Sequence, residues 1–171
     1  MSNITICGVT ARPEEHAAGS LPVTTLANGF LLDIPFHVLH GAKSGPRLLL
    51  TAVSHGDAIT GMEVIRQVME QLDLRKLSGT LITVPVQNPI GFEWGERNTP
   101  IDRDNMNRTY PGNPKGWFTE QMAAAISPLC KEADASIDWH GGGPGTAIHY
   151  ILISREPGEL GRRIREMAFD Y

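Results

Sequence analysis

Hydrophobic and polar positions along the chain alternate in blocks that have the length of strands and helices. Within residues 21–40, two extended runs lie on either side of the segment Ala27-Asn28-Gly29. Asn and Gly both tolerate a positive φ, so this pair is typical of a tight turn between antiparallel strands. The pattern predicts an N-terminal β-hairpin over about residues 21–40.

A strand, a helix and a second strand are predicted next. Residues 47–53 form a continuous apolar run, which is typical of a strand that is covered on both faces. Apolar side chains recur at helical spacing over residues 59–75, and residues 81–86 read as another buried strand. This order predicts a right-handed βαβ unit, and ligands of such sheets lie beyond the carboxyl ends of the strands. His55 follows one of these ends.

The segment 87–116 has a different composition. It contains four Pro, four Gly and five Asn, and no hydrophobic period is sustained in it. A loop of this length inside a compact domain is usually functional or disordered. Its aromatic residues Phe92, Trp94 and Tyr110 argue against plain disorder. We therefore expect a functional loop here.

Further helices and strands are predicted after this loop. Residues 117–133 have a helical pattern, which we expect Pro128 to bend or to end early. A short strand over residues 135–140 ends in His140, and residues 148–154 predict a further strand. A last helix, rich in arginine, begins around Pro157. Together the elements predict an α/β fold with a mixed, mostly parallel sheet flanked by helices.

Composition narrows the class of protein. The chain has 171 residues, of which 41% are hydrophobic and 20% charged, so residues 1–171 are expected to form a single domain with its own core. The net charge of −4 argues against a general binder of nucleic acids or membrane surfaces, which select for Lys and Arg. Only Cys7 and Cys130 are present, without a paired spacing. No signal peptide or membrane span is recognisable, and we expect a cytoplasmic protein.

Two histidines follow predicted strand ends. If both strands are parallel, His55 and His140 reach the same edge of the sheet, where ligands distant in sequence can converge on a zinc ion at about 2.0–2.2 Å. The alternative for each histidine is an ordinary surface or hydrogen-bonded core residue. Asp138 lies two positions before His140, on the same strand face, and is either an orienting partner for a ring nitrogen or a polar strand-end residue.

The long loop also contains a group of cationic side chains. Guanidinium groups bind carboxylates through two hydrogen bonds, so a cluster beside a metal indicates a small anionic substrate. The alternative is that these arginines pair with acids of the same loop, namely Glu93, Glu96, Asp102 and Asp104. The residues concerned are Arg97, Arg103, Asn107 and Arg108.

In this order the residues resemble a known family, the succinylglutamate desuccinylase/aspartoacylase group of the zinc carboxypeptidase-like fold. The resemblance covers roughly residues 21–145 and depends on an ordered set of motifs, each of which is weak alone. These motifs are Gly45-Pro46-Arg47 with the leucines after it, His55-Gly56-Asp57 with Gly61, the segment from Asn88-Pro89-Ile90-Gly91-Phe92 through Arg97 to Asn107-Arg108-Thr109-Tyr110-Pro111-Gly112, and Asp138-Trp139-His140.

The resemblance implies roles for five residues. His55 and His140 would be two of three ligands of one Zn²⁺, Arg97 would polarise the scissile carbonyl group, and Asn107 with Arg108 would hold the substrate carboxylate. The implied reaction is hydrolysis of the amide or ester bond of a small N-acyl amino acid by a metal-activated water. The implied fold is the zinc carboxypeptidase/phosphorylase-hydrolase-like fold.

The chain departs from the family pattern in three ways. Ala58 stands where the family has its Glu ligand, so zinc is expected to bind weakly or not at all. Asn105 stands where many members have Asp. The family's general-base Glu lies on a strand well after the third ligand, whereas this sequence ends at Tyr171, so we expect a domain that is incomplete at its C-terminus.

Three readings remain open. The chain is an active zinc deacylase in which Asp57 or a water replaces the missing ligand. Alternatively, it is a catalytically impaired family member (a pseudoenzyme, a Glu-to-Ala variant or a fragment) that acts as a small-anion binding or interaction module. The third reading is an unrelated α/β domain. A sheet that is cut short leaves an unpaired edge, so self-association into a homo-oligomer is expected.

Overall fold

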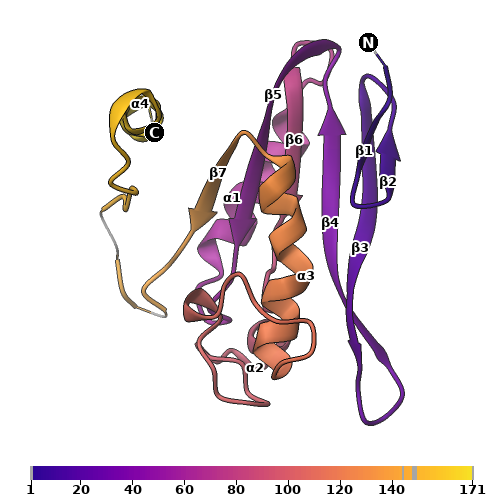
Figure 1. The fold of residues 1–171 in the computed structure, drawn as a ribbon, viewed down its shortest axis with the longest axis vertical. Coiled ribbons are helices and arrows are strands. Elements are labelled where there is room, and N and C mark those ends of the chain that lie inside the picture. The colour runs from indigo at the N-terminus through magenta and orange to yellow at the C-terminus, as the bar shows by residue number, and fades with distance from the viewer. Residues whose placement is uncertain (1, 144, 148–149, 171) are drawn as a thin grey trace.

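The computed structural model describes residues 2–143, 145–147 and 150–170, and its central element is a five-stranded mixed sheet (Figure 1). The strand order is β3-β4-β6-β5-β7, and a separate antiparallel pair joins β1 and β2. Strand β4 is antiparallel to β3 and β6, whereas β5 is parallel to β6 and β7. The strands are β1 (Ile4–Ile6), β2 (Val9–Ala11), β3 (Glu15–Thr25), β4 (Leu31–His40), β5 (Lys43–Ala52), β6 (Ser78–Val84) and β7 (Ala135–Trp139).

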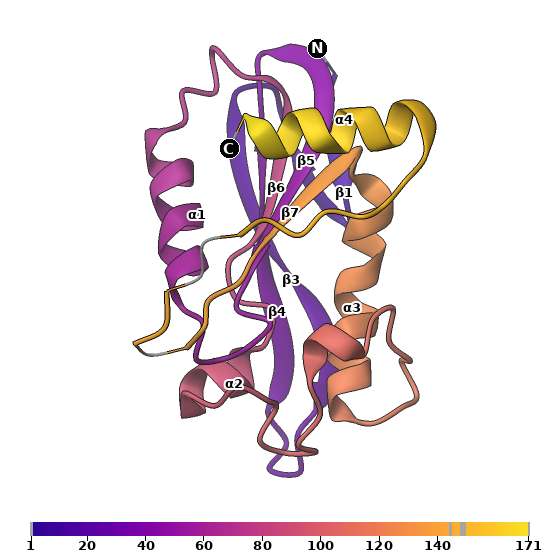
Figure 2. The same cartoon turned by 90° about the vertical axis from the view of Figure 1, so that its left-hand side faces the viewer.

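Helices cover both faces of this sheet, with α1 on one side and α3 on the other (Figure 2). The α/β class with a mixed sheet flanked by helices is therefore confirmed. The sheet is half rather than mostly parallel, because β4 runs antiparallel to both of its neighbours. The helices are α1 (Thr60–Gln71), α2 (Pro89–Trp94), the short 3₁₀ helix η1 (Met106–Arg108), α3 (Phe118–Glu132) and α4 (Gly158–Phe169).

Strand β5 has apolar packing on both faces. Leu49 belongs to the core cluster that includes Met122 and Ile126 of α3, while Leu50 belongs to the cluster that includes Ile65 of α1. A strand covered twice needs apolar residues at successive positions, which explains the uninterrupted run in the sequence. The predicted βαβ unit of β5, α1 and β6 is confirmed.

The predicted N-terminal hairpin corresponds to β3 and β4, and it begins earlier than the sequence pattern indicated, at Glu15. Gly29 adopts a φ of +86° in the turn, and its amide donates a hydrogen bond of 2.8 Å to the carbonyl oxygen of Leu26. The division of the chain into a single domain over residues 1–171 stays a prediction.

Two sequence predictions need correction, and a third is refined. Helix α3 continues through Pro128 to Glu132, so the expected early end is wrong. The strand predicted over residues 148–154 is wrong for residues 150–154, which have no regular structure, while residues 148 and 149 lie outside the described part of the chain. The segment 87–116 is mainly loop but also forms α2 and η1.

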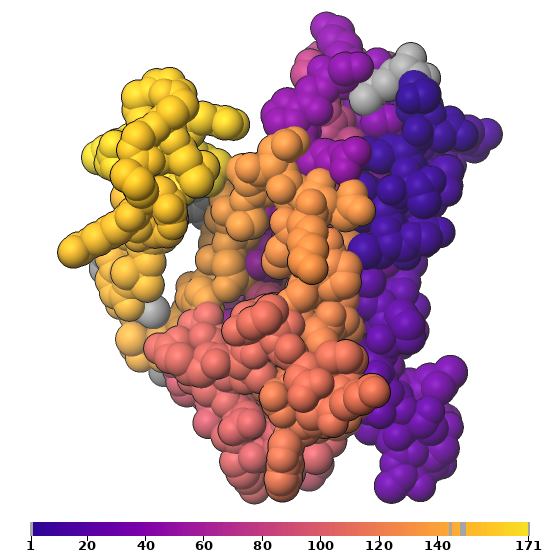
Figure 3. Space-filling view, viewed as in Figure 1, coloured from indigo at the N-terminus to yellow at the C-terminus, as the bar shows by residue number. Residues whose placement is uncertain are grey.

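Strand β7 lies at one edge of the sheet, with β5 as its neighbour. Self-association through that edge is not tested by the fold and stays a prediction, as does the cytoplasmic location. Helix α4 lies beside the body of the molecule and is largely exposed (Figure 3). Within the ranges that the structure describes, no helix combines the length and the apolar character needed to cross a membrane.

Candidate functional site

The histidines that follow two parallel strands meet at the carboxyl edge of the sheet. Strands β5 and β7 are neighbours, with Ala52 opposite Trp139, so His55 and His140 lie just beyond the same edge. Their Nδ1 atoms are 3.3 Å apart and their ring centroids 5.2 Å apart. The predicted convergence of the two imidazoles is therefore present in the fold.

A sharp turn carries His55. Val53 adopts a φ of +55°, which is unfavourable for a β-branched residue, and its carbonyl oxygen accepts a hydrogen bond of 3.0 Å from the amide of Asn88. A Cβ added at Gly56 would lie 2.0 Å from the carbonyl carbon of Gly91 in α2. Only glycine can occupy this position, because the turn packs directly on the helix backbone. His55 is 3% exposed as a result.

The outer nitrogen of each histidine faces an oxygen. His55 Nε2 lies 3.0 Å from Asn105 Oδ1, and the Asn107 amide donates to this same oxygen at 3.0 Å, which fixes the orientation of the Asn105 amide. His140 Nε2 lies 2.7 Å from Asp138 Oδ2. Each Nε2 thus carries the hydrogen, and each Nδ1 of a neutral ring presents a lone pair.

Two lone pairs that face each other repel unless a proton on one of the rings or a metal ion lies between them. Two nitrogens bound to one tetrahedral Zn²⁺ at about 2.0–2.1 Å are about 3.3 Å apart, which matches the separation of the two Nδ1 atoms. Hydrogen bonds that the outer nitrogens donate to oxygen acceptors are the usual support of metal-binding histidines. The donor set at His55 and His140 therefore fits two positions of a zinc site.

A third protein ligand is missing from this geometry. Ala58 is 3% exposed, and a Cβ added at Gly141 would lie 3.3 Å from the Ala58 methyl group. Within the described residues, no group of three or more His, Cys, Asp and Glu side chains is arranged to share one metal ion. In this arrangement, Asp57 does not complete a three-ligand group with the two histidines.

Asp138 is held by a network that sequence reasoning identified only in part. Its Oδ1 accepts hydrogen bonds of 2.7 Å from Thr51 Oγ1 and from Gln87 Nε2, and Tyr110 donates to Gln87 Oε1 at 2.5 Å. Burial raises the pKa of Tyr110 well above its usual value, and the Asp138 carboxylate adds to this, so the phenol stays a donor. Thr51 and Gln87 were missed, although Gln87 also follows a strand end, the signal that identified His55.

The loop arginines divide into two groups. Arg103 forms an ion pair of 2.8 Å with Glu96, so the alternative of pairing within the loop is correct for this residue. Arg97 and Arg108 are exposed, and neither has an acidic partner within ion-pair distance in the described part of the chain. Arg108 donates to the carbonyl oxygen of Asn107 at 3.0 Å. Both guanidinium groups are therefore available to an anion from outside these residues.

Arg97 also acts electrostatically on the site. The pKa of His55 lies below its ordinary value, chiefly because burial disfavours the charged ring, and the positive charges of Arg97 and His140 lower it further. The hydrogen bond to Asn105 and the negative charge of Asp57 act in the opposite direction. His55 is therefore biased towards the neutral form that can bind a metal.

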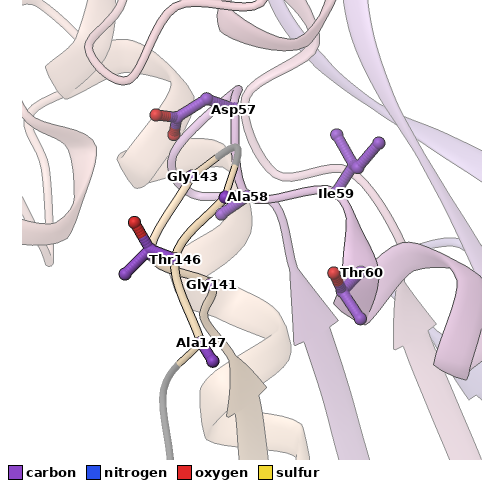
Figure 4. A pocket seen from close by; sticks show the side chains of 10 residues that line it. Asp57, Ala58, Ile59, Thr60, Gly141, Gly143, Thr146 and Ala147 are labelled. Atoms are coloured by element: carbon purple, nitrogen blue, oxygen red, sulfur yellow. The ribbon is translucent and has the colours of Figure 1, made fainter.

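A cavity of 510 Å³ opens beside the histidines (Figure 4). Its walls come from the residues that directly follow each histidine, residues 57–60 on one side and residues 141–143 and 145–147 on the other. Asp57 lies on this wall, and its Oδ1 atom is buried without a hydrogen-bond partner. The cavity is therefore formed by the two segments that continue the chain beyond the histidines.

Comparisons of the sequence with known proteins identify one family. Residues 44–169 match the model of the succinylglutamate desuccinylase/aspartoacylase catalytic domain. The chain is 35% identical over 131 residues to the N-alpha-acetyl-L-2,4-diaminobutyric acid deacetylase of Halomonas elongata, covering 75% of this chain and 38% of that protein.

Solved structures support the same relationship. A succinylglutamate desuccinylase/aspartoacylase from Rhodobacter sphaeroides is 30% identical, with a TM-score of 0.69 over 75% of this chain and 40% of that one. The product-bound ectoine utilization protein EutE (DoeB) from Ruegeria pomeroyi is 33% identical, with a TM-score of 0.67 over 77% and 41%. A candidate carboxypeptidase A from Shewanella denitrificans shares the fold at 19% identity, with a TM-score of 0.58 over 74% and 35%. The chain thus spans about 40% of the length of these relatives.

Proposed function

The chain belongs to the succinylglutamate desuccinylase/aspartoacylase catalytic-domain family, and on this premise we propose that it binds one Zn²⁺ between His55 and His140 and removes the acyl group from small N-acyl amino acids. The observation that carries the proposal is the pair of facing Nδ1 atoms whose outer nitrogens are both held by oxygen acceptors. The Halomonas relative, named as a deacetylase of an N-acetyl amino acid, supports the reaction class.

The side chains around the histidines would divide the work of such a reaction. A bound Zn²⁺ would polarise the scissile carbonyl group and lower the pKa of a water molecule. Asn105 and Asp138 hold the two rings in the orientation and tautomer that bind a metal. Arg97 would stabilise the negative charge that develops on the carbonyl oxygen, while Asn107 and Arg108 would hold the substrate carboxylate.

The test is hydrolysis by the metal-free protein before and after addition of one equivalent of Zn²⁺. We expect acetate release from N-acetyl-L-2,4-diaminobutyrate to depend on zinc, and Arg97→Ala to lower kcat by about a hundredfold because a transition-state charge loses its partner. Arg103→Ala is the matched control, since that guanidinium is already paired with Glu96. Equal losses in both variants, or release that does not respond to zinc, would refute the proposal.

Ala58 favours a second candidate function. Its methyl group cannot coordinate a metal, and a site with two ligands binds zinc more weakly than one with three. The chain would then be a catalytically impaired family member that binds small N-acyl amino acids through Arg97, Asn107 and Arg108. This candidate predicts that N-acetyl amino acids bind, as measured by calorimetry, equally well with and without Zn²⁺ and that no acetate is released.

A further inference from the structure

Asp57 has a carboxylate oxygen that lacks a partner inside the protein. Its Oδ1 is removed from solvent and accepts no hydrogen bond, and within the described residues Ser54 Oγ is the other buried side-chain atom in this state. An oxygen of this kind is costly to bury, because it loses its hydration without compensation. A positive charge bound beside this carboxylate would offset part of this cost through its electrostatic attraction, without contact to the buried Oδ1 itself.

The obvious internal partners for this oxygen are excluded. Asp57 and the two histidines do not form a set of three side chains arranged for one metal ion. No Lys or Arg lies within ion-pair distance of Asp57 in the part of the chain that the structure describes. The carboxylate therefore needs a cation from outside these residues.

The position of Asp57 relates it to the site. It lies two residues after His55 and lines the cavity of 510 Å³ that the residues following His140 close on the other side. The backbone at Gly143 approaches it closely, because a Cβ added there would lie 2.7 Å from Asp57 Oδ2 (Figure 4). The carboxylate is thus part of the cavity wall, next to the place where the acyl bond would be held.

We propose that Asp57 is a specificity-determining residue that binds a positively charged side chain of the amino-acid part of the substrate. This inference rests on the proposed function and deepens it. Arg108 offers its free charge to the α-carboxylate, while Asp57 offers the opposite charge at the cavity wall. The preferred substrates are N-acyl diamino acids, and acyl amino acids with a second carboxylate are repelled.

The test measures product binding, so that it does not depend on turnover. Calorimetry compares three probes that differ in side-chain charge, L-2,4-diaminobutyrate, L-2-aminobutyrate and L-aspartate. We expect the diaminobutyrate to bind at least about tenfold more tightly than the other two, and Asp57→Asn to abolish this preference while leaving the affinity for L-2-aminobutyrate unchanged. Asp33→Asn, which removes an exposed acid on β4, is the matched control and should preserve the preference.

Several results would overturn the inference while leaving the proposed function intact. These are an equal affinity of the wild type for the three probes, a preference that survives in Asp57→Asn, or a loss of zinc binding in Asp57→Asn, which would make Asp57 a metal ligand. Failure of the proposed function is seen separately, as the absence of zinc-dependent acetate release. If acetate release is absent but Asp57→Asn still removes the preference for the positively charged probe, the inference about Asp57 is supported. Circular dichroism of Asp57→Asn verifies that the variant is folded.

Discussion

Two pairs of histidines in this molecule have almost the same internal geometry. The rings of His55 and His140 have centroids 5.2 Å apart and an interplanar angle of 58°, while those of His16 and His37 have centroids 5.1 Å apart at the same angle. The first pair follows the carboxyl ends of β5 and of the edge strand β7, and the second lies on the β3–β4 hairpin. Ring distance alone does not separate a metal site from a surface contact.

The difference lies in which nitrogens face each other. In the hairpin pair, His16 Nε2 meets His37 Nδ1 at 3.1 Å, so one neutral ring can donate and the other accept. In the strand-end pair, two Nδ1 atoms face each other, and both outer nitrogens are held by Asn105 and Asp138. A hydrogen bond between two neutral rings satisfies the first arrangement, whereas in the second the two Nδ1 atoms need an additional proton or a metal ion between them. The residues around the rings therefore decide the chemistry.

The largest expected difference concerns metal binding. His140→Ala leaves one imidazole at the strand ends, so we expect zinc affinity to fall by about a hundredfold or more, to the level of non-specific binding. His16→Ala removes one ring from the hairpin pair and should leave zinc affinity unchanged. Competition with a chelating dye measures both variants. A similar loss in the two variants would remove the distinction between the pairs.

Restoring a carboxylate at position 58 should strengthen the strand-end pair. We expect Ala58→Glu to raise zinc affinity by about tenfold to a hundredfold, because a third protein ligand joins the two Nδ1 atoms. The cavity beside Ala58 provides room for the longer side chain. Ile59→Glu is the matched control, since Ile59 is 52% exposed and its side chain points away from Gly141 (Figure 4). An equal gain in both variants would indicate a general charge effect.

Removing the support of one outer nitrogen should have a smaller effect. Asp138→Asn keeps the size of the side chain but removes the charge that faces His140 Nε2, and we expect zinc affinity to fall by about tenfold. Thr51→Val deletes one of the two hydrogen bonds to Asp138 Oδ1 and should lower the affinity by a smaller factor. An unchanged affinity in Asp138→Asn would show that the orientation of His140 does not depend on this carboxylate.

The sequence predicts the parts of this site that depend on regular structure. An apolar run identifies β5 and a short alternating segment identifies β7, so the convergence of His55 and His140 follows from strand ends alone. The contacts of Asn105 and Arg103 lie in a segment without a hydrophobic period, where tertiary packing decides which side chain faces the site and which pairs with Glu96.

The apolar residues 150–153 were predicted to be part of a strand. A strand also needs a neighbouring strand to pair with, and the sequence pattern does not reveal whether one is present.

The smallest expected effect belongs to the hairpin pair and concerns pH. The pKa of His37 is lowered by burial and, to a lesser extent, by the positive charge of His16, so the folded state binds a proton less readily than the unfolded state. The neutral His37 ring is therefore compatible with the folded state above about pH 6.5. As the pH falls through the lower pKa of the folded state, protonation favours the unfolded state and this part of the stability is lost. Because His37 is half-buried and screened by solvent, we expect a contribution to the free energy of unfolding of about 0.5 kcal/mol or less.

Urea unfolding at pH 7.5 and pH 5 should show a smaller decrease in the free energy of unfolding for His37→Asn than for the wild type. Equal decreases would mean that the hairpin pair has no electrostatic role, and would leave the strand-end pair as the only one of the two whose surroundings matter.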